Sequence, residues 1–205
     1  MCGQVGIIFG RKRRRPDERD YLRELFIRML LHSEERGPHA SGLAWLKTDG
    51  SHRIFKRPMR AHELVYEKPF QELLGQVDNE TTILMGHTRW RTRGNEFNNR
   101  NNHPIRAGIV IGTHNGTIYN ADYLFRRLGL PRYAEVDSEL IFRLADRFAP
   151  EGPIDQDGLK KAEIELGKLY YRDYAVGEEL DTAEYLPWCQ KIDESKKAIA
   201  ELKDF

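Results

Sequence analysis

The hydrophobic and polar positions of the first sixty residues predict strands and a helix in alternation. Residues 3–9 are apolar and partly β-branched, which predicts a buried strand that begins almost at the N-terminus. Apolar residues at helical spacing predict a helix over residues 17–35. Residues 41–47 and 52–57 predict two strands joined by the turn Asp49-Gly50-Ser51, a strong signal for a hairpin.

The next part of the chain predicts short helices and further strands around one polar loop. Residues 61–75 are expected to form two short helices, and residues 81–88 and 108–113 are expected to form strands. Between these strands, residues 89–102 are polar and rich in asparagine, so we expect a loop that cannot pack as core. Loops held between strands commonly carry binding and catalytic residues.

The remainder of the chain is expected to be helical. Residues 120–128 and 137–148 predict two helices, and a linker rich in proline and glycine follows at residues 150–153. Residues 162–205 keep helical spacing without clear strands. We therefore expect a first domain over residues 1–161 and a helical C-terminal extension of unknown role over residues 162–205.

The balance of charges argues against several classes of partner. The 205 residues contain 33 Lys and Arg and 32 Asp and Glu, so we expect no nucleic-acid partner. The basic run Arg11–Arg15 stands between a predicted strand and a predicted helix, where a solvated loop is the simpler interpretation. No segment approaches the roughly 20 apolar residues that a membrane helix needs. The apolar start also lacks a signal-peptide pattern, which predicts a cytoplasmic protein without membrane contact.

The second residue is the first candidate for chemistry. Removal of Met1 would leave Cys2 with a thiol and a free α-amine on one residue. An α-amino group titrates near ~7.7 to 8.0, so it can accept the thiol proton at neutral pH while the thiolate attacks a carboxamide. The alternative is a cysteine placed there by accident, but the apolar strand that follows would hold this terminus rigidly in the fold.

Two further groups of residues fit the same chemistry. Asn115 and Gly116 follow a predicted strand and could donate to a tetrahedral oxyanion, an effect commonly worth roughly 3 to 4 kcal/mol per donor. Arg89 could bind the carboxylate of free glutamine and Asp137 its ammonium group. Taken singly, each has an ordinary alternative: a hairpin turn for the Asn-Gly pair, and a surface salt bridge for the Arg and Asp pair.

The histidines and the second cysteine are assigned no chemistry of their own. Seven histidines lack the spacing of metal ligands, so we expect no metal and no cofactor. Three of them flank the candidate site and are expected to support its loops by hydrogen bonds: His87, His103 and His114. Cys189 is interpreted as a packing residue, and no disulfide framework is implied.

Five segments carry a specific family resemblance when they are taken in order: MCGQVGIIFG, GHTRWRTRG, NNHPI, THNGTIYN and VDSELIF. Over about residues 1–161 the chain resembles the class II, N-terminal nucleophile glutamine amidotransferases, and in motif it is most similar to the glutaminase domain of glucosamine-6-phosphate synthase. The resemblance implies that Cys2 is the nucleophile, that Asn115 and Gly116 form the oxyanion hole, and that Arg89 and Asp137 bind glutamine. It also places Trp90 and Thr92 in a loop that closes over glutamine. Arg93 stands where that type has histidine.

The family fold is an α+β, four-layer αββα sandwich, and this chain is expected to hold an incomplete or divergent version with a helical C-terminal tail. Core strands that the family has are not visible in residues 162–205, which would favour self-association or reliance on a partner. The implied activity is hydrolysis of L-glutamine to L-glutamate and ammonia through a γ-glutamyl thioester, with ammonia passing to a separate synthase. Two alternatives stay open: a catalytically silent glutamine-binding or regulatory module, and a hydrolase of another amide.

Overall fold

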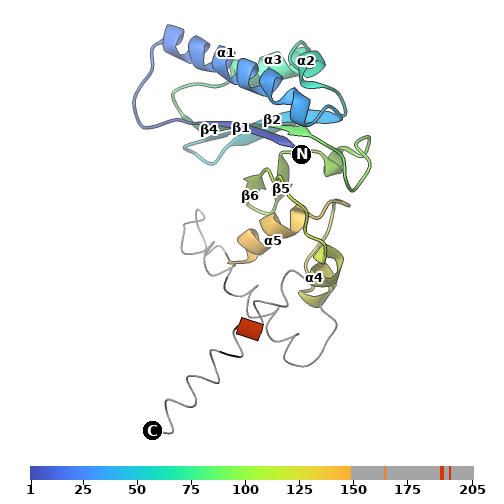
Figure 1. Ribbon diagram of the computed structural model, residues 1–205. Coiled ribbons are helices and arrows are strands. Elements are labelled where there is room, and N and C mark those ends of the chain that lie inside the picture. Colours follow the sequence, from blue (N-terminus) through green and yellow to red (C-terminus); the bar gives the residue numbers. More distant parts are fainter. Residues whose placement is uncertain (149–163, 165–189, 192–193, 195–205) are drawn as a thin grey trace. The chain divides into compact units, whose positions relative to one another are not determined.

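The computed structural model describes residues 1–148, 164, 190–191 and 194 (Figure 1). The chain divides into two compact units. The first unit holds residues 1–117 and 131–142, and the second holds residues 118–130 and the chain from 143 onward. The predicted domain boundary at 161 and nearly all of the predicted helical extension lie outside the described residues, so both stay predictions.

A four-stranded antiparallel sheet forms the centre of the first unit, with the strand order β1-β4-β2-β3. All four strands were predicted, and the hairpin between β2 and β3 is confirmed, with Gly50 at a φ of 81° in its turn. The strands are β1 (Gly3–Ile8), β2 (Ala40–Lys47), β3 (His52–Arg57) and β4 (Thr81–Arg89).

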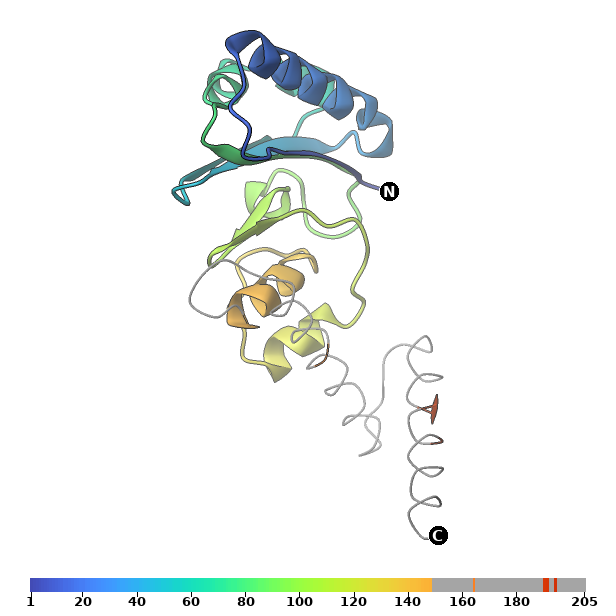
Figure 2. The same ribbon diagram turned by 90° about the vertical axis from the view of Figure 1, so that its left-hand side faces the viewer.

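Helices cover one face of this sheet (Figures 1 and 2). Helix α1 begins at Pro16, where proline suits the first helical position, and Glu18 Oε2 accepts a hydrogen bond from the Arg15 N–H at 2.8 Å. The predicted helix over 17–35 therefore ends slightly early and continues as a short 3₁₀ turn. Phe26 and Leu30 of α1 are fully buried against the sheet core. The elements are α1 (Pro16–His32), the 3₁₀ turn Glu34–Arg36, α2 (Ala61–Leu64) and α3 (Lys68–Gly75).

The prediction that residues 3–9 form a buried strand holds for only one face of β1. β1 is an edge strand of the sheet, and its side chains alternate between a buried and an exposed face. Val5 and Ile7 pack against the core beneath α1, whereas Ile8 is 84% exposed. The sequence hides this alternation because glycine occupies two positions of the strand and offers no side chain to show the pattern.

A second, two-stranded sheet contains β5 (Ile105–Ala107) and β6 (Val110–Gly112). It lies on the side of the four-stranded sheet opposite α1 (Figures 1 and 2). The sequence predicted one strand over 108–113 and missed β5. Gly108 has a φ of 62° and turns the chain there, so the apolar stretch folds into a hairpin instead of one strand. Ile105 and Ala107 form a small core with Val136 and Phe142.

Two helices complete the described structure. α4 (Ala121–Arg127) belongs to the second unit, and α5 (Glu139–Phe148) begins in the first unit and continues in the second. Both were predicted to within two residues. In the second unit, Arg147 donates to the Leu128 carbonyl at 2.9 Å. The described structure is thus a mixed α+β fold with antiparallel sheets, as expected, and none of its described helices is long and apolar enough to span a bilayer.

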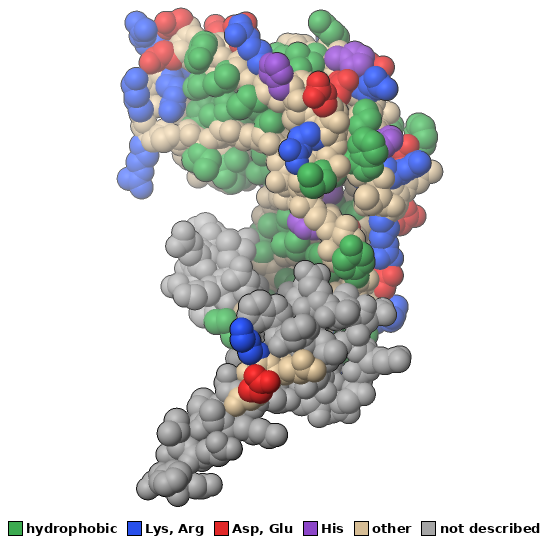
Figure 3. Space-filling view, in the orientation of Figure 1, with side chains coloured by type: hydrophobic (Ala, Val, Ile, Leu, Met, Phe, Trp, Pro, Cys, Tyr) green, Lys and Arg blue, Asp and Glu red, His purple; other side chains and the backbone are tan. Residues whose placement is uncertain are grey.

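The basic run Arg11–Arg15 lies in the connection between β1 and α1, as predicted. Its charges are partly compensated, since Lys12 pairs with Glu18 and Arg15 with Asp17, each at 3.1 Å. Figure 3 shows positive and negative side chains interleaved on the visible face of this region. These exposed pairs contribute little to stability, typically below about 1 kcal/mol each.

Candidate active site

The first residues of β1 bring Cys2 against the end of β4. Gly3 pairs with Thr88, so Cys2 lies where the chain leaves β4 as Trp90. The Trp90 N–H donates to Cys2 Sγ at 3.3 Å, and Cys2 Sγ lies 3.6 Å from the Trp90 carbonyl oxygen. Arg36 Nε donates to the Cys2 carbonyl at 3.1 Å. The thiol is therefore held between two chain segments that are far apart in sequence.

Asn115 meets Cys2 although 113 positions separate them. The Cys2 N–H donates to Asn115 Oδ1 at 3.1 Å, while 79% of Met1 is exposed. The neighbouring contact, from Gln4 Nε2 to Thr113 Oγ1 at 3.1 Å, links β1 to the same segment. The hairpin interpretation of Asn115-Gly116 was wrong, because β6 pairs with β5, which precedes it, and no strand follows within residues 117–148.

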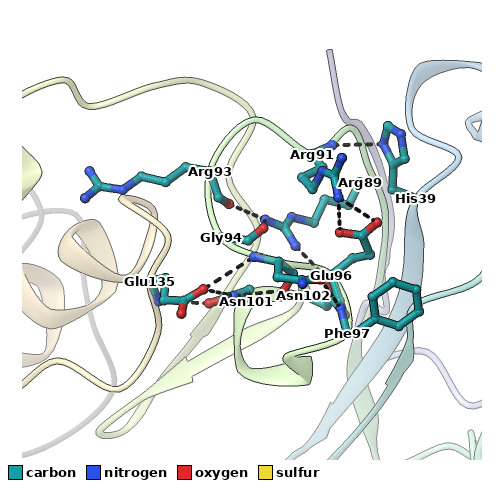
Figure 4. Close-up of polar contacts among 11 residues, drawn as sticks. His39, Arg89, Arg91, Arg93, Gly94, Glu96, Phe97, Asn101, Asn102 and Glu135 are labelled. Atoms are coloured by element: carbon teal, nitrogen blue, oxygen red, sulfur yellow. Dashed lines mark hydrogen bonds and ion pairs between the residues drawn. The ribbon is translucent and has the colours of Figure 1, made fainter.

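Arg89 ends β4 with its guanidinium turned into the following loop (Figure 4). It donates to the Asn102 side-chain oxygen and to the Gly94 carbonyl, each at 2.9 Å, and also to the Arg93 carbonyl. Only 3% of Arg89 is exposed, and this burial lowers the pKa of the guanidinium, whereas the nearby Cys2 and the carboxylates of Glu96 and Asp137 raise it. The alternative of an exposed surface salt bridge is excluded for Arg89 by its burial.

The prediction that residues 89–102 cannot pack as core was wrong for part of this stretch, although most of its residues are exposed or half-buried. Asn101 and Asn102 are fully buried in a network of hydrogen bonds (Figure 4). Asn102 Nδ2 donates to the Glu96 carbonyl at 2.7 Å, and Asn101 Nδ2 donates to Glu135 Oε2 at 2.7 Å. Each buried amide thus has hydrogen-bond partners within the loop or at Glu135, and these bonds offset the cost of removing the amides from water.

Asp137 and Ser138 immediately precede α5, and Ser138 contacts the segment that carries Asn115. Asp137 is 5% exposed, and its carbonyl accepts from the Leu140 N–H at 3.0 Å at the start of the helix. Ser138 Oγ lies 3.0 Å from His114 Nδ1, which connects this segment to the one that carries Asn115. Thr92 is exposed, and no hydrogen bond joins it to the other candidate residues in the described structure.

The three flanking histidines differ in what they do. His87 Nε2 lies 3.3 Å from the His114 carbonyl oxygen, which bears out the expected loop support. His103 does not hydrogen-bond through its ring within the described structure. It stacks instead on His87, with 4.3 Å between ring centroids. Burial lowers the pKa of His87 to about 3 and the pKa of His103 well below its usual range, so both rings are neutral.

Several curated relatives match most of this chain in sequence. No family model matches the chain. Glutamine–fructose-6-phosphate aminotransferase (isomerizing) from Staphylococcus epidermidis is 31% identical over 183 residues, which cover 86% of this chain and 27% of the relative. The same enzyme from Sulfurisphaera tokodaii is 31% identical over 156 residues, which cover 74% of this chain and 24% of the relative. That from Staphylococcus aureus is 30% identical over 181 residues, which cover 86% of this chain and 27% of the relative. The chain therefore spans about a quarter of the length of these relatives.

The chain is homologous to the N-terminal glutaminase domain of glucosamine-6-phosphate synthase, and so it is a glutamine amidotransferase-related domain. In this amidotransferase domain the sequence had singled out Cys2, Arg89, Asn115 and Asp137, and the structure brings Cys2 directly to Asn115. Their catalytic and binding roles are proposals taken up below.

Two residues of this amidotransferase domain escaped the sequence analysis. Arg36 donates to the Cys2 carbonyl, and His39 Nδ1 accepts from the Arg91 N–H at 3.0 Å. Arg36 ends the 3₁₀ turn after α1 and His39 follows Gly37-Pro38, in a stretch that sequence reasoning treated only as a link between elements. No spacing signal marks them, because each acts on a partner at least 34 positions away.

The buried histidines of the amidotransferase domain predict acid sensitivity. Because the pKa of His87 falls to about 3 in the fold, the unfolded chain binds its proton first as pH drops below ~6.5. The contribution of these neutral histidines to the free energy of unfolding is therefore fully present above about pH 6.5. It is lost towards pH 3, by up to about 1.4 kcal/mol per pH unit for each such histidine. His87→Gln should flatten the slope of unfolding free energy against pH, measured by urea denaturation, whereas the exposed control His32→Gln should not. Equal slopes in wild type and His87→Gln would contradict this origin.

Proposed function

We propose that this domain hydrolyses L-glutamine to L-glutamate and ammonia, with Cys2 as the nucleophile after removal of Met1. The observation that carries the proposal is the environment of one residue: Asn115 Oδ1 accepts from the nitrogen of Cys2 while the Trp90 backbone flanks its sulfur. A thiol and an amine held in this way supply nucleophile and base together. The relatives' printed name, an aminotransferase that uses glutamine, supports the same substrate.

The chemistry balances without any further reactant except water. The α-amine of Cys2 takes the thiol proton, and Sγ attacks the side-chain carbonyl carbon of glutamine. The tetrahedral intermediate collapses, the C–N bond breaks, and the protonated amine gives its proton to the departing nitrogen, which leaves as ammonia. Water then attacks the γ-glutamyl thioester, releases glutamate and restores the thiol.

We assign stabilisation of the oxyanion in the tetrahedral intermediate to Asn115 and Gly116. Because Asn115 Oδ1 is engaged by the Cys2 nitrogen, its Nδ2 group is directed away from that contact. Among the described residues, neither this Nδ2 group nor the Gly116 N–H has a hydrogen-bond partner. Two donors beside the nucleophile, both without a partner, are what a developing oxyanion requires.

Recognition of the free amino acid is assigned to Arg89 and Asp137. A guanidinium has five N–H donors, and Arg89 uses three of them on carbonyl oxygens, which leaves two for the substrate carboxylate. Asp137 supplies a buried negative charge for the substrate ammonium group. Trp90 and Thr92 are proposed to close over the bound substrate, and both are exposed in this structure.

The wider context of the reaction is part of the same proposal. We infer that the fold is an αββα sandwich of the N-terminal nucleophile type, which the mixed α+β architecture and its two antiparallel sheets support. We also infer that ammonia is delivered to a separate synthase. The relatives are about four times longer than the matched region, so an acceptor site outside this domain agrees with their length.

The test is an ammonia-release assay with L-glutamine, paired with intact-mass analysis of the purified protein. We expect the mass to lack Met1, ammonia and glutamate to form in equal amounts, and a γ-glutamyl adduct to appear on Cys2 after rapid acid quenching. Protein that begins at Cys2 and still releases no ammonia would overturn the proposal.

The substrate assignment gives a separate prediction. Wild-type protein should prefer L-glutamine over N-acetyl-glutamine, because acetylation removes the positive charge that Asp137 is proposed to bind. Asp137→Asn should lower kcat/KM for L-glutamine by about 30-fold, the loss expected from one charged hydrogen bond of about 2 kcal/mol, and should change the N-acetyl substrate little. The measurement is steady-state kinetics on both substrates. An equal loss on both would show that Asp137 does not recognise the ammonium group.

A further inference from the structure

His39 lies at the start of β2, beside the loop that flanks Cys2. Its backbone N–H donates to the Arg89 carbonyl at 3.1 Å, just before Ala40 pairs with Arg89 in the sheet. His39 therefore lies at the end of the two central strands, where β4 ends and the loop begins (Figure 4). This placement is rigid because both neighbouring strands are fixed by sheet hydrogen bonds.

The side chain of His39 makes two contacts with that loop. Its Nδ1 accepts a hydrogen bond from the Arg91 N–H at 3.0 Å. Its ring also packs edge-on against the Trp90 ring, with 5.3 Å between centroids and an interplanar angle of 75°. Acceptance at Nδ1 requires that the ring proton stand on Nε2, so one neutral tautomer fits this arrangement.

The same loop is held from its other side by Glu96. Both carboxylate oxygens of Glu96 accept from Arg91 NH1, at 2.8 and 3.1 Å. Arg91 is thus fixed at its backbone by His39 and at its side chain by Glu96. Trp90 is 46% exposed, and within the described part of the chain its polar and ring contacts are with Cys2 and His39.

The contacts form a short chain that ends at the sulfur. His39 holds the Arg91 N–H and the Trp90 ring, and these two groups flank the Trp90 peptide. That peptide donates to Cys2 Sγ at 3.3 Å and lies with its carbonyl at 3.6 Å from the same atom. A loop that rotates about Arg91 would carry both Trp90 backbone groups away from the nucleophile. Displacements of about 1 Å at a reacting group commonly cost about 100-fold in rate.

We propose that His39 is a positioning residue that sets the Trp90–Arg91 loop against Cys2 for glutamine hydrolysis. The inference rests on the proposed function, but its structural part can be measured without turnover. His39 has no contact with Cys2. It contacts the Trp90 ring and, through its backbone, the Arg89 carbonyl, so its side chain acts on the nucleophile through the loop. An acceptor at the position of Nδ1 is the property that matters.

The test compares His39→Leu, which removes the acceptor, with His39→Asn, whose side-chain oxygen can take the place of Nδ1. Hydrogen exchange of the Arg91 amide, followed by ¹H–¹⁵N NMR, reports on the loop in the absence of glutamine. We expect exchange to accelerate by about tenfold in His39→Leu, which corresponds to one lost hydrogen bond of about 1.4 kcal/mol, and to return close to wild type in His39→Asn. His52→Leu, a change at the start of β3, is the matched control and should leave the Arg91 amide unaffected.

Kinetics on L-glutamine form the second arm of the same experiment. His39→Leu should lower kcat by about tenfold with a smaller change in KM, because it displaces groups at the thiol while leaving Arg89 and Asp137 in place. His39→Asn should recover most of this loss, which a merely structural defect would not do. The proposal would be overturned if the Arg91 amide of His39→Leu exchanged at the wild-type rate. It would also be overturned if that amide exchanged faster while kcat stayed unchanged. Absence of turnover in wild type would refute the proposed function instead, and the exchange arm would still decide whether His39 holds the loop.

Discussion

Cys2→Ala is expected to lower ammonia release from L-glutamine by at least about 10,000-fold, leaving no γ-glutamyl adduct. Alanine at position 2 retains the α-amine and its contact with Asn115 Oδ1, but its methyl side chain cannot form the thioester on which the two-step reaction depends. The oxyanion donors and the glutamine-binding residues would remain in place. The substitution therefore removes the chemistry and leaves binding, and calorimetry should still detect glutamine.

Two controls make this result specific. Cys189→Ala removes the second cysteine and should leave ammonia release unchanged, which separates the Cys2 thiol from a general effect of losing a thiol. Intact mass must show that Cys2→Ala loses Met1 as wild type does, because alanine is also small enough to permit that processing. Ammonia release by processed Cys2→Ala at the wild-type rate would refute the assigned nucleophile and favour a different catalytic group.

Gly3→Ala is expected to be the second most damaging change, with a loss of at least about 100-fold in glutamine hydrolysis and lower stability. A Cβ atom at Gly3 would lie 2.5 Å from Thr88 Oγ1, 2.6 Å from Ser33 Cβ and 2.7 Å from the Ser33 carbonyl oxygen. Thr88 and Ser33 are buried and already joined by a hydrogen bond of 2.6 Å, so neither can yield without losing it. Overpacking of this kind costs about 1 to 3 kcal/mol.

The clash would move the residue that precedes it. If β1 shifts to make room for the methyl group, Cys2 leaves its contacts with Asn115 and Trp90, and a misplacement near 1 Å accounts for the expected loss of rate. Gly6→Ala is the matched control on the same strand, since its Cβ would meet only the Leu84 carbonyl oxygen, at 3.5 Å. Activity and urea denaturation should be measured for both variants. A fully active Gly3→Ala would show that β1 does not set the position of Cys2.

These expectations share one structural cause, which is that the nucleophile has no rigid element of its own. Cys2 precedes the first residue of β1 and owes its place to partners from three other parts of the chain: Arg36, Trp90 and Asn115. Changes at Gly3 and His39 therefore reach the thiol without touching the substrate. The buried histidine pair acts on another property, the dependence of stability on pH.

The sequence by itself determined the α+β class and the four strands of the main sheet, and it singled out the residues that are proposed to carry the chemistry. Local signals sufficed for these, because alternation, helical spacing and turn residues act over a few neighbours, as at Gly50 in the β2–β3 hairpin. The motif residues were recognised as a set, although nothing local tied Cys2 to Asn115 across 113 positions.

Tertiary structure alone decided which polar residues are buried and which apolar ones are exposed. Asn101 and Asn102 read as loop residues but are buried, because Glu135, Glu96 and the chain around them satisfy every amide group they carry. Ile8 reads as core but is exposed, because along β1 it alternates with Ile7 and lies on the face opposite the core that Val5 and Ile7 contact. The contacts of His39 with Trp90 and Arg91 exist only once β2 and β4 are paired, and no property of the chain near His39 reports which strand lies beside it.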